Sequence, residues 1–270
     1  MVLKIGLVGC GAIGAEIARA IDRGDISAEL ISVYDTSSKG AHRLIESLKV
    51  KPKLSGLDEL IDLSDIVVEA ASQKAVPSVA KAALGKGKDL MIMSVGALLN
   101  RDLYQTVEDL ARKNNCKVYL PSGAISGLDG LKSAGVGHIS KITLTTTKNP
   151  AGFAGAPYLL EKGIDLDAIS GPTILFEGSA EDAVKAFPAN VNVAATLNLT
   201  AQDHKVEVKI VADPKIKVNI HQITAEGNFG KVTTRVENVP SPSNPKTSYL
   251  AALSAIATLR SIVEPIKIGT

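Results

Sequence analysis

The sequence predicts an α/β fold, with a doubly wound parallel sheet in its N-terminal part and an α+β region after it. In the first 120 residues, short apolar segments alternate with longer segments in which apolar residues have helical spacing. From about residue 139, apolar and polar residues alternate with a period of two, as in a sheet that covers a core with one face. A chain of 270 residues suffices for one large domain or two modest ones.

The parallel sheet is predicted from the order of segments in the N-terminal part. Strands are expected at 3–8, 29–34, 65–71, 89–95 and 117–120, with helices near 13–22, 39–47, 75–87 and 101–114. Strands that alternate with helices pair in parallel through right-handed crossovers. A ligand is then expected beyond the carboxyl ends of the strands, where residues 70–73 include Ala71 and Ser72.

The first predicted strand leads into a glycine motif, Gly9-Cys10-Gly11-Ala12-Ile13-Gly14. Gly9 permits a tight turn, Gly11 lets the backbone approach a phosphate, and Gly14 lets the following helix pack closely on the strand. The free N–H groups at the helix start face an anion. The second strand ends at Asp35, about 20 residues after the motif, where a carboxylate meets the ribose hydroxyls of adenosine. Together these features predict a Rossmann-type domain that binds a dinucleotide, rather than a glycine turn without a ligand.

Asp35 also bears on the choice of cofactor. Its carboxylate favours NAD, because it bonds the 2′-hydroxyl and repels a 2′-phosphate. Lys39 and the hydroxyl groups of residues 36–38 follow, and they could receive a phosphate if Asp35 turned aside. We therefore predict NAD as the preferred cofactor, with NADP tolerated.

A second domain is predicted over residues 122–246, after a dinucleotide-binding domain at 1–121. Its alternating strands are expected at 141–147, 205–211, 217–223 and 231–236, interrupted by helices near 180–186 and 189–200. A last helix, 247–263, follows three prolines, and its apolar content predicts that it packs back on the first domain. We expect the open face of the second sheet to carry the substrate residues.

Of the four histidines, His221 is the candidate for chemistry. The other three are interpreted as surface or structural residues: His42, His138 and His204. His221 lies in a predicted strand, before a Gly/Asn turn typical of a hairpin, and shares a face with Asn219 and Ile223. An imidazole there could exchange a proton near neutral pH, although the pattern alone also fits a structural histidine.

Two further segments carry polar residues at predicted helix starts. Asn190 and Asn192 open the helix near 189–200; one of them suffices as a cap, which leaves the other for a cofactor amide or a substrate carboxylate. Residues 244–248 are read as another helix start, with Lys246 near the positive end of the dipole. That arrangement suits an anionic ligand, or marks only a boundary between loop and helix.

Composition argues against several function classes. The net charge of +2 gives no strong field for nucleic acid or an anionic membrane, and the scarcity of aromatic residues argues against stacking on single strands. The apolar stretches fall short of the roughly 18–20 residues that span a bilayer. Two cysteines, Cys10 and Cys116, cannot form a disulfide framework or a metal cluster. Because the first strand begins at once, no signal peptide is expected, and we predict a cytoplasmic enzyme without nucleic-acid, membrane or metal partners.

Several motifs along the whole chain resemble the L-aspartate dehydrogenase family. They lie at residues 9–14, 68–72, 94–98, 121–129, 187–195, 221–230 and 244–248. The resemblance implies NAD(P)-dependent oxidation of L-aspartate to iminoaspartate, which serves pyridine nucleotide biosynthesis or hydrolyses to oxaloacetate and ammonia. It implies that His221 is the active-site histidine and that Ala124 and either Asn190 or Asn192 contact the cofactor, with Asn190 slightly favoured. The connection 149–180 is longer than we expect for compact members.

The implied substrate needs groups that bind two carboxylates. We expect cationic or N–H donors from the following residues: Ser122, Gly123, Ile125, Lys246, Thr247 and Ser248. His221 would accept the proton of the amino group. The alternatives are a reductase of the homoserine dehydrogenase or dihydrodipicolinate reductase type, and an NAD sensor without turnover. A homodimer is expected, because open antiparallel sheets commonly pair across a two-fold axis.

Overall fold

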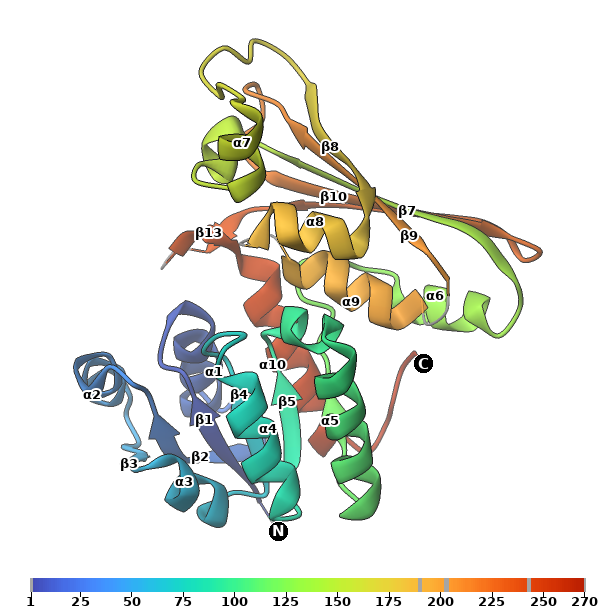
Figure 1. Ribbon diagram of the computed structural model, residues 1–270. Coiled ribbons are helices and arrows are strands. Elements are labelled where there is room, and N and C mark those ends of the chain that lie inside the picture. The colour runs from blue at the N-terminus through green and yellow to red at the C-terminus, as the bar shows by residue number, and fades with distance from the viewer. Residues whose placement is uncertain (1, 189–190, 202–203, 242–243, 270) are drawn as a thin grey trace. The chain divides into compact units, whose positions relative to one another are not determined.

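The computed structural model describes residues 2–188, 191–201, 204–241 and 244–269. The chain divides into two compact units, and each has its own sheet (Figure 1). Unit 1 comprises Met1–Gly123 and Ala251–Lys267, and unit 2 comprises Ala124–Leu250 and Ile268–Thr270. The sequence-based boundary at 121/122 lies close to the point where the chain leaves unit 1.

The sheet of unit 1 is parallel throughout, with the strand order β3-β2-β1-β4-β5-β6. Its strands are β1 (Leu3–Val8), β2 (Ala28–Tyr34), β3 (Lys53–Leu54), β4 (Ile66–Glu69), β5 (Asp89–Ile92) and β6 (Val118–Tyr119). The order reverses between β1 and β4, and ligands of doubly wound sheets bind beyond the carboxyl ends of the strands at such a switch point. The predicted fold class of this unit is confirmed.

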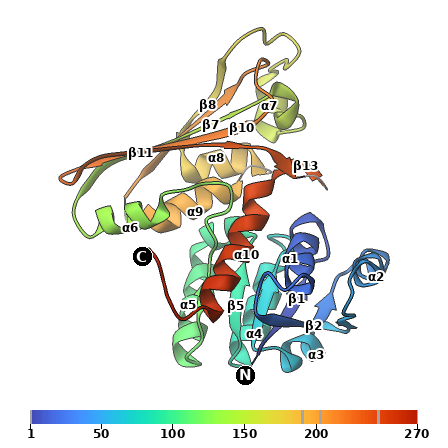
Figure 2. The ribbon, with the colours of Figure 1, turned by 180° about the vertical axis from the view of Figure 1, so that it is seen from behind.

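Helices cover both faces of this sheet (Figures 1 and 2). One face carries α1 (Ala12–Asp22), α2 (Ser38–Ser47) and α10 (Tyr249–Val263), and the other carries α3 (Leu57–Leu63), α4 (Val76–Gly85) and α5 (Arg101–Lys113). A 3-10 helix, η1 (Val95–Leu99), precedes α5. Ala255 and Leu259 of α10 are fully buried in the core beside Ile17 of α1. The sequence pattern missed β3 and α3, because segments of two and seven residues are too short to show a period.

The sheet of unit 2 has five strands in the order β11-β10-β7-β9-β8. They are β7 (Ile139–Lys148), β8 (Thr173–Ser179), β9 (Val206–Ala212), β10 (Asn219–Gly227) and β11 (Gly230–Asn238). All neighbouring strands are antiparallel except β7 and β9, so the sheet is mixed rather than antiparallel as expected. The helices α6 (Leu128–Gly135), α8 (Ala180–Ala186) and α9 (Val191–Ala201) lie on one face (Figures 1 and 2). The connection between β7 and β8 holds η2 (Pro150–Phe153) and α7 (Pro157–Lys162).

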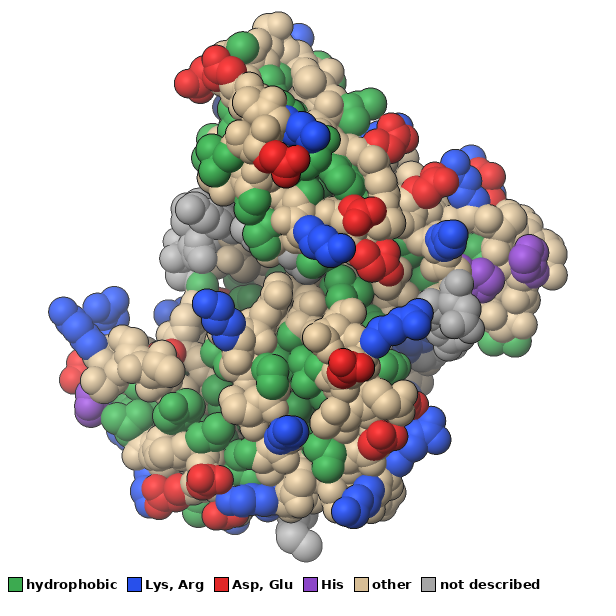
Figure 3. All heavy atoms as spheres, in the orientation of Figure 1, with side chains coloured by type: hydrophobic (Ala, Val, Ile, Leu, Met, Phe, Trp, Pro, Cys, Tyr) green, Lys and Arg blue, Asp and Glu red, His purple; other side chains and the backbone are tan. Residues whose placement is uncertain are grey.

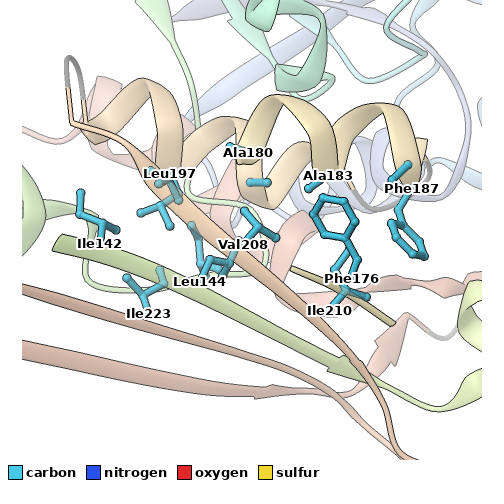
Figure 4. Close-up of a cluster of buried hydrophobic side chains, with 14 of the residues drawn as sticks. Ile142, Leu144, Phe176, Ala180, Ala183, Phe187, Leu197, Val208, Ile210 and Ile223 are labelled. Carbon is cyan, nitrogen blue, oxygen red and sulfur yellow. The ribbon is translucent and has the colours of Figure 1, made fainter. Parts of the chain in front are cut away.

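The covered face of this sheet is apolar over most of its area. Ile142 and Leu144 of β7 lie beside Val208 of β9, and α8 and α9 pack over them with small and branched side chains (Figure 4). The strands alternate as predicted, since residues two apart share a face. This core fixes which side of each strand is buried, and so decides where the remaining polar residues of the strands lie.

The expected helix start at residues 244–248 is wrong. Asn244–Ser248 forms a strand, β13, which pairs with β12 (Pro240–Ser241), and α10 begins only at Tyr249. The backbone of this segment is therefore extended and pairs with another strand, so Thr247 and Ser248 do not offer helical N–H groups. The pattern also missed α6, α7 and β8, which lie in or beside long connections.

Candidate active site

The glycine turn of unit 1 packs directly against the chain that follows β4. Gly9 has a φ of +99°, and its N–H donates to the carbonyl oxygen of Tyr34 at 2.8 Å. A Cβ at Gly9 would lie 2.6 Å from the carbonyl group of Ala70, and one at Gly14 would lie 2.0 Å from the oxygen of Gly9. A side chain at either position would displace backbone, so both glycines are required by packing alone.

Gly11 differs from these two glycines. A Cβ there would have no neighbour within 4 Å in the described part of the chain, so packing does not require a glycine. Gly11 is the N-cap residue of α1, and it provides no side chain to bond the N–H groups of the first turn. Open space beside uncapped N–H groups, where Ala12 and Ile13 begin the helix, fits the pyrophosphate of a dinucleotide.

Asp35 is held at the end of β2 by two backbone groups. Its Oδ2 accepts a hydrogen bond from the N–H of Cys10 at 2.7 Å, and its Oδ1 accepts one from the N–H of Ser37 at 2.7 Å. Each oxygen keeps a lone pair for a ribose hydroxyl. Burial, with the charge on Asp35, raises the pKa of the Cys10 thiol to about 12, so this thiol stays protonated and is not a nucleophile.

On the other side of the switch point, a buried carboxylate holds the chain that follows β4 in place. Glu69, at the end of β4, is fully buried. It accepts hydrogen bonds from the N–H groups of Ala71 at 2.9 Å and Ser72 at 3.0 Å, and from the N–H and hydroxyl of Ser94 at 3.0 and 2.9 Å. Burial raises the pKa of Glu69, and the hydrogen bonds from Ser94, Ala71 and Ser72 oppose that rise. Glu69 lies within the sequence motif at 68–72, but the motif does not indicate that this side chain holds Ala71 and Ser72.

Basic side chains gather on α2, just after Asp35 (Figure 3). Lys39, His42 and Arg43 line one open hollow of about 470 Å³ with Ser38 and Glu46. They share a face because residues three and four apart are neighbours on a helix. This hollow offers cations to an anion near the end of β2.

Unit 2 contains a buried polar cluster that consists of Thr146 and Lys148 on β7, His221 on β10 and Asn238 on β11. The four residues are 6, 9, 4 and 2% exposed, respectively. His221 pairs with Thr146 across the two strands, and Asn238 pairs with Asn219. Residues two apart on a strand share a face, so the cluster continues the covered face of the sheet beyond the point where its apolar side chains end.

The expectation that the substrate residues lie on the open face of this sheet is wrong for His221. Ile223 and Ala225, two and four residues along β10, belong to the apolar core. Alternation therefore places His221 on the covered face. The open face carries side chains of the opposite register, including Gln222 and Thr224.

The imidazole of His221 is neutral in this setting. Its Nδ1 lies 3.0 Å from the hydroxyl oxygen of Thr146. Burial, together with the positive charge on Lys148, lowers the pKa of His221 to about 3. The sequence predicted proton exchange near neutral pH, and these surroundings oppose it. A negative charge placed beside Lys148 would raise the pKa of the imidazole again.

Lys148 is buried in unit 2, and the sequence pattern did not identify it. Burial lowers its pKa to about 8, so the ammonium group still predominates at neutral pH. Gly152 packs against its side chain, since a Cβ there would lie 3.6 Å from Cβ and Cδ of Lys148. Gly152 also lines a cavity of about 70 Å³ with residues 153–157, Phe187 and Pro188.

Asn238 forms a hydrogen bond between this cluster and Ala124, the first residue of unit 2. Its Nδ2 donates to the carbonyl oxygen of Ala124 at 3.0 Å. Ala124 and Ile125 are buried, and the side chain of Ile125 belongs to the core rather than to the polar cluster. Within unit 1, the N–H of Gly123 donates to the hydroxyl of Ser254 at 3.0 Å, next to the half-buried Ser122.

The remaining candidates are described only in part. Asn190 and the side chain of Lys246 lie outside the described residues. Asn192 is exposed in the first turn of α9. Ser248 is buried at the end of β13, and Thr247 is half-buried. Among the described residues, no group of three His, Cys, Asp or Glu side chains is placed to hold a metal ion. None of the described helices combines the length and apolar character needed to cross a membrane.

Both units match known protein families. Residues 129–262 match the family described as "Aspartate dehydrogenase, C-terminal", and residues 9–121 match "Homoserine dehydrogenase, NAD binding domain". An L-aspartate dehydrogenase from Methanosarcina acetivorans is 54% identical over 270 residues, which cover 99% of this chain and 100% of the relative. One from Nitrosopumilus maritimus is 47% identical over 271 residues, with 99% of each chain covered.

Solved structures also resemble this chain. The crystal structure of aspartate dehydrogenase from Thermotoga maritima has a TM-score of 0.77 at 28% identity and covers 100% of both chains. A homoserine dehydrogenase from Thiobacillus denitrificans has a TM-score of 0.62 at 12% identity, covering 96% of this chain and 74% of its own. The second likeness shows the fold alone.

Proposed function

Because the chain belongs to the aspartate dehydrogenase family, we propose that it catalyses the NAD(P)-dependent oxidative deamination of L-aspartate. The product is iminoaspartate, which hydrolyses to oxaloacetate and ammonia or feeds pyridine nucleotide biosynthesis. The observation that carries the proposal is the buried polar cluster of unit 2, where a histidine, a hydroxyl and a cation lie together. Unit 1, for its part, contains a glycine turn that fits a dinucleotide.

In this reaction the Cα–H bond of L-aspartate breaks and its electron pair leaves as hydride. The nitrogen lone pair forms the C=N bond, so the amino group must first be neutral. A nicotinamide, when bound, supplies the hydride acceptor at C4. The chain binds the pyrophosphate through the N–H groups of α1 and the ribose hydroxyls through Asp35. His221 accepts the proton that the substrate ammonium releases.

The geometry of the cluster supports separate roles for its members. Thr146 contacts Nδ1 of His221, which leaves Nε2 for the substrate. Lys148 would bind a substrate carboxylate with its ammonium group. That carboxylate would offset the charge of Lys148 and so raise the pKa of His221, which makes the imidazole a stronger base when the substrate is present.

Replacing Lys148 with Met is expected to raise KM for L-aspartate roughly 10- to 100-fold, because one carboxylate loses its cation. The same change is expected to raise the pKa of His221, since a positive neighbour disfavours the imidazolium. Steady-state kinetics and an NMR titration of the imidazole measure the two effects. Lys141→Met, an exposed position on the same strand, is the control. An unchanged KM in Lys148→Met would contradict the assigned role.

We propose NAD as the preferred cofactor, with NADP tolerated. Two backbone N–H groups hold the Asp35 carboxylate in place, which supports NAD, and the basic hollow on α2 supports residual use of NADP. Lys39→Ala is expected to lower kcat/KM for NADP roughly tenfold, equivalent to about 1.4 kcal/mol. The same substitution should change kcat/KM for NAD by less than about twofold. Lys81→Ala, exposed on α4, is the control. An equal decrease of kcat/KM with both cofactors would contradict a contact between Lys39 and the 2′-phosphate of NADP.

The substrate is tested by following reduced nicotinamide with L-aspartate, D-aspartate, L-glutamate and L-homoserine, each with NAD and NADP. Turnover confined to L-aspartate supports the proposal. Turnover of L-homoserine would favour a homoserine dehydrogenase, and NAD binding without any turnover would favour a sensor. The proposal also includes a cytoplasmic location and a homodimer; light scattering tests the latter.

A further inference from the structure

Asn238 contains a buried hydrogen-bond acceptor that none of the described residues uses. The residue lies at the end of β11 and is 2% exposed. Its Nδ2 donates to the carbonyl oxygen of Ala124 at 3.0 Å. A carbonyl oxygen can only accept, so this bond fixes the orientation of the side-chain amide. Oδ1 then points away from Ala124, and it has no donor among the residues that the structure describes.

Such an acceptor destabilises a protein unless something donates to it. A donor that arrives with a ligand would remove this cost, and the position of Asn238 indicates which ligand. Asn219 pairs with Asn238, and His221 follows Asn219 by two residues on the same face. Asn238 and His221 are therefore diagonal neighbours on adjacent strands, within one buried polar cluster.

We propose that Asn238 binds the amino group of the substrate, with Oδ1 accepting a hydrogen bond from the substrate N–H. This inference rests on the proposed function, in which His221 acts on the same amino group. Lys148, the cation of the cluster, suits a carboxylate, whereas the neutral amide oxygen of Asn238 suits an N–H donor. Lys148 and Asn238 thus bind two different groups of one amino acid, and His221 accepts the proton of the amino group that Asn238 holds.

The hydrogen bond to Oδ1 becomes stronger as the reaction proceeds. When hydride leaves Cα, the nitrogen becomes part of a cationic iminium group, whose N–H bonds are better donors than those of a neutral amine. An acceptor already held in place by Ala124 stabilises that charge without reorganisation. The same oxygen disfavours oxidation of a 2-hydroxy acid, because the resulting carbonyl oxygen has no hydrogen to donate.

The test uses the full-length protein and two variants. Asn238→Leu removes the acceptor, and Asn238→Asp keeps an acceptor oxygen but loses the N–H bond to Ala124. We expect Asn238→Leu to lower kcat/KM for L-aspartate roughly 100-fold, and Asn238→Asp to lower it less than tenfold. The inhibition constant of succinate, which has both carboxylates and no amino group, should change less than threefold in the uncharged variant Asn238→Leu. Equal losses in the two variants would overturn the proposal, since the bond to Ala124 would then be the group that matters.

The carboxamide of the nicotinamide is the other N–H donor that the reaction contains. An NAD analogue with an acetyl group in place of the carboxamide lacks that donor. We expect the substitution Asn238→Leu to lower kcat/KM for L-aspartate by the same factor with NAD and with the analogue. A decrease that occurs only with NAD would overturn the proposal. Wild-type protein that fails to oxidise L-aspartate would reject the proposed function itself. Wild-type turnover together with an unimpaired Asn238→Leu variant would reject only the role of Asn238.

Discussion

His221→Ala is expected to reduce kcat for L-aspartate about 10²- to 10⁴-fold, the usual contribution of a positioned acid or base. The substrate ammonium would lose its proton to water instead of to a buried imidazole. The Kd for NAD should stay near the wild-type value, because the glycine turn, Asp35 and Glu69 belong to unit 1 and His221 belongs to unit 2. Steady-state kinetics and fluorescence titration with NADH measure the two quantities.

His138→Ala serves as the matched control, since His138 belongs to the same unit and is exposed. It should keep wild-type kcat. Full turnover by His221→Ala would remove this residue from the mechanism. A lowered kcat together with a weakened Kd for NAD would instead indicate that the substitution perturbs the fold, which thermal unfolding would reveal.

Glu69→Gln is expected to lower the free energy of unfolding by about 2–4 kcal/mol, because a buried hydrogen bond to a charged group is worth about 1.5–3 kcal/mol. The carboxylate accepts four hydrogen bonds, and a carboxamide would turn an NH₂ group toward one of their donors. That NH₂ group would face the N–H of Ser94 and push the side chain that holds Ala71 and Ser72 out of place, so we expect the Kd for NAD to rise about tenfold, or about 1.4 kcal/mol. Chemical denaturation and NADH titration measure these changes.

The control is Glu29→Gln, at an exposed position on β2 of the same sheet. It should change the free energy of unfolding by less than about 0.5 kcal/mol. If Glu69→Gln were as stable as the wild type, the carboxylate would not be what holds the chain after β4. A loss of stability without a change in Kd would separate the structural role from cofactor binding.

Much of unit 1 could be predicted from the sequence because its signals are local. The apolar run of β1 and the glycine turn are contiguous, and Asp35 follows the next strand at the expected distance. The predicted bounds of β1 agree with the structure, and those of α1 differ by one residue. In the five-stranded sheet of unit 2, alternation predicted β7, β9, β10 and β11 in the same way, but not β8.

Alternation does not say which face of a strand the helices cover. The side of the sheet on which α8 and α9 pack is decided by tertiary contacts, and it is this choice that buries His221. Nor does the pattern say that β7 and β9 pair in parallel while their other neighbours are antiparallel. The face on which His221 lies and the parallel pairing were therefore predicted wrongly, although β7, β9 and β10 were themselves predicted as strands.

The site residues that could not be predicted from the sequence are those whose contacts lie far away along the chain. Glu69 bonds Ser94, 25 residues away; Thr146 contacts His221, 75 residues away; and Asn238 bonds Ala124, 114 residues away. No local motif marks Glu69 or Asn238 as an acceptor. Lys148 ends an alternating strand, where a lysine ordinarily reaches solvent, so only the fold reveals that it is buried.

The helix α10 has a consequence for how the chain is made. It completes the core of unit 1, yet residues 124–250 separate it from the rest of that unit. During synthesis from the N-terminus, the apolar surface that Ala255 and Leu259 will cover therefore stays open until α10 has emerged. Most of unit 2 has been made by then. The first unit to begin folding is thus the last to be finished, and a ribosome that stops early releases a dinucleotide-binding sheet with an exposed face.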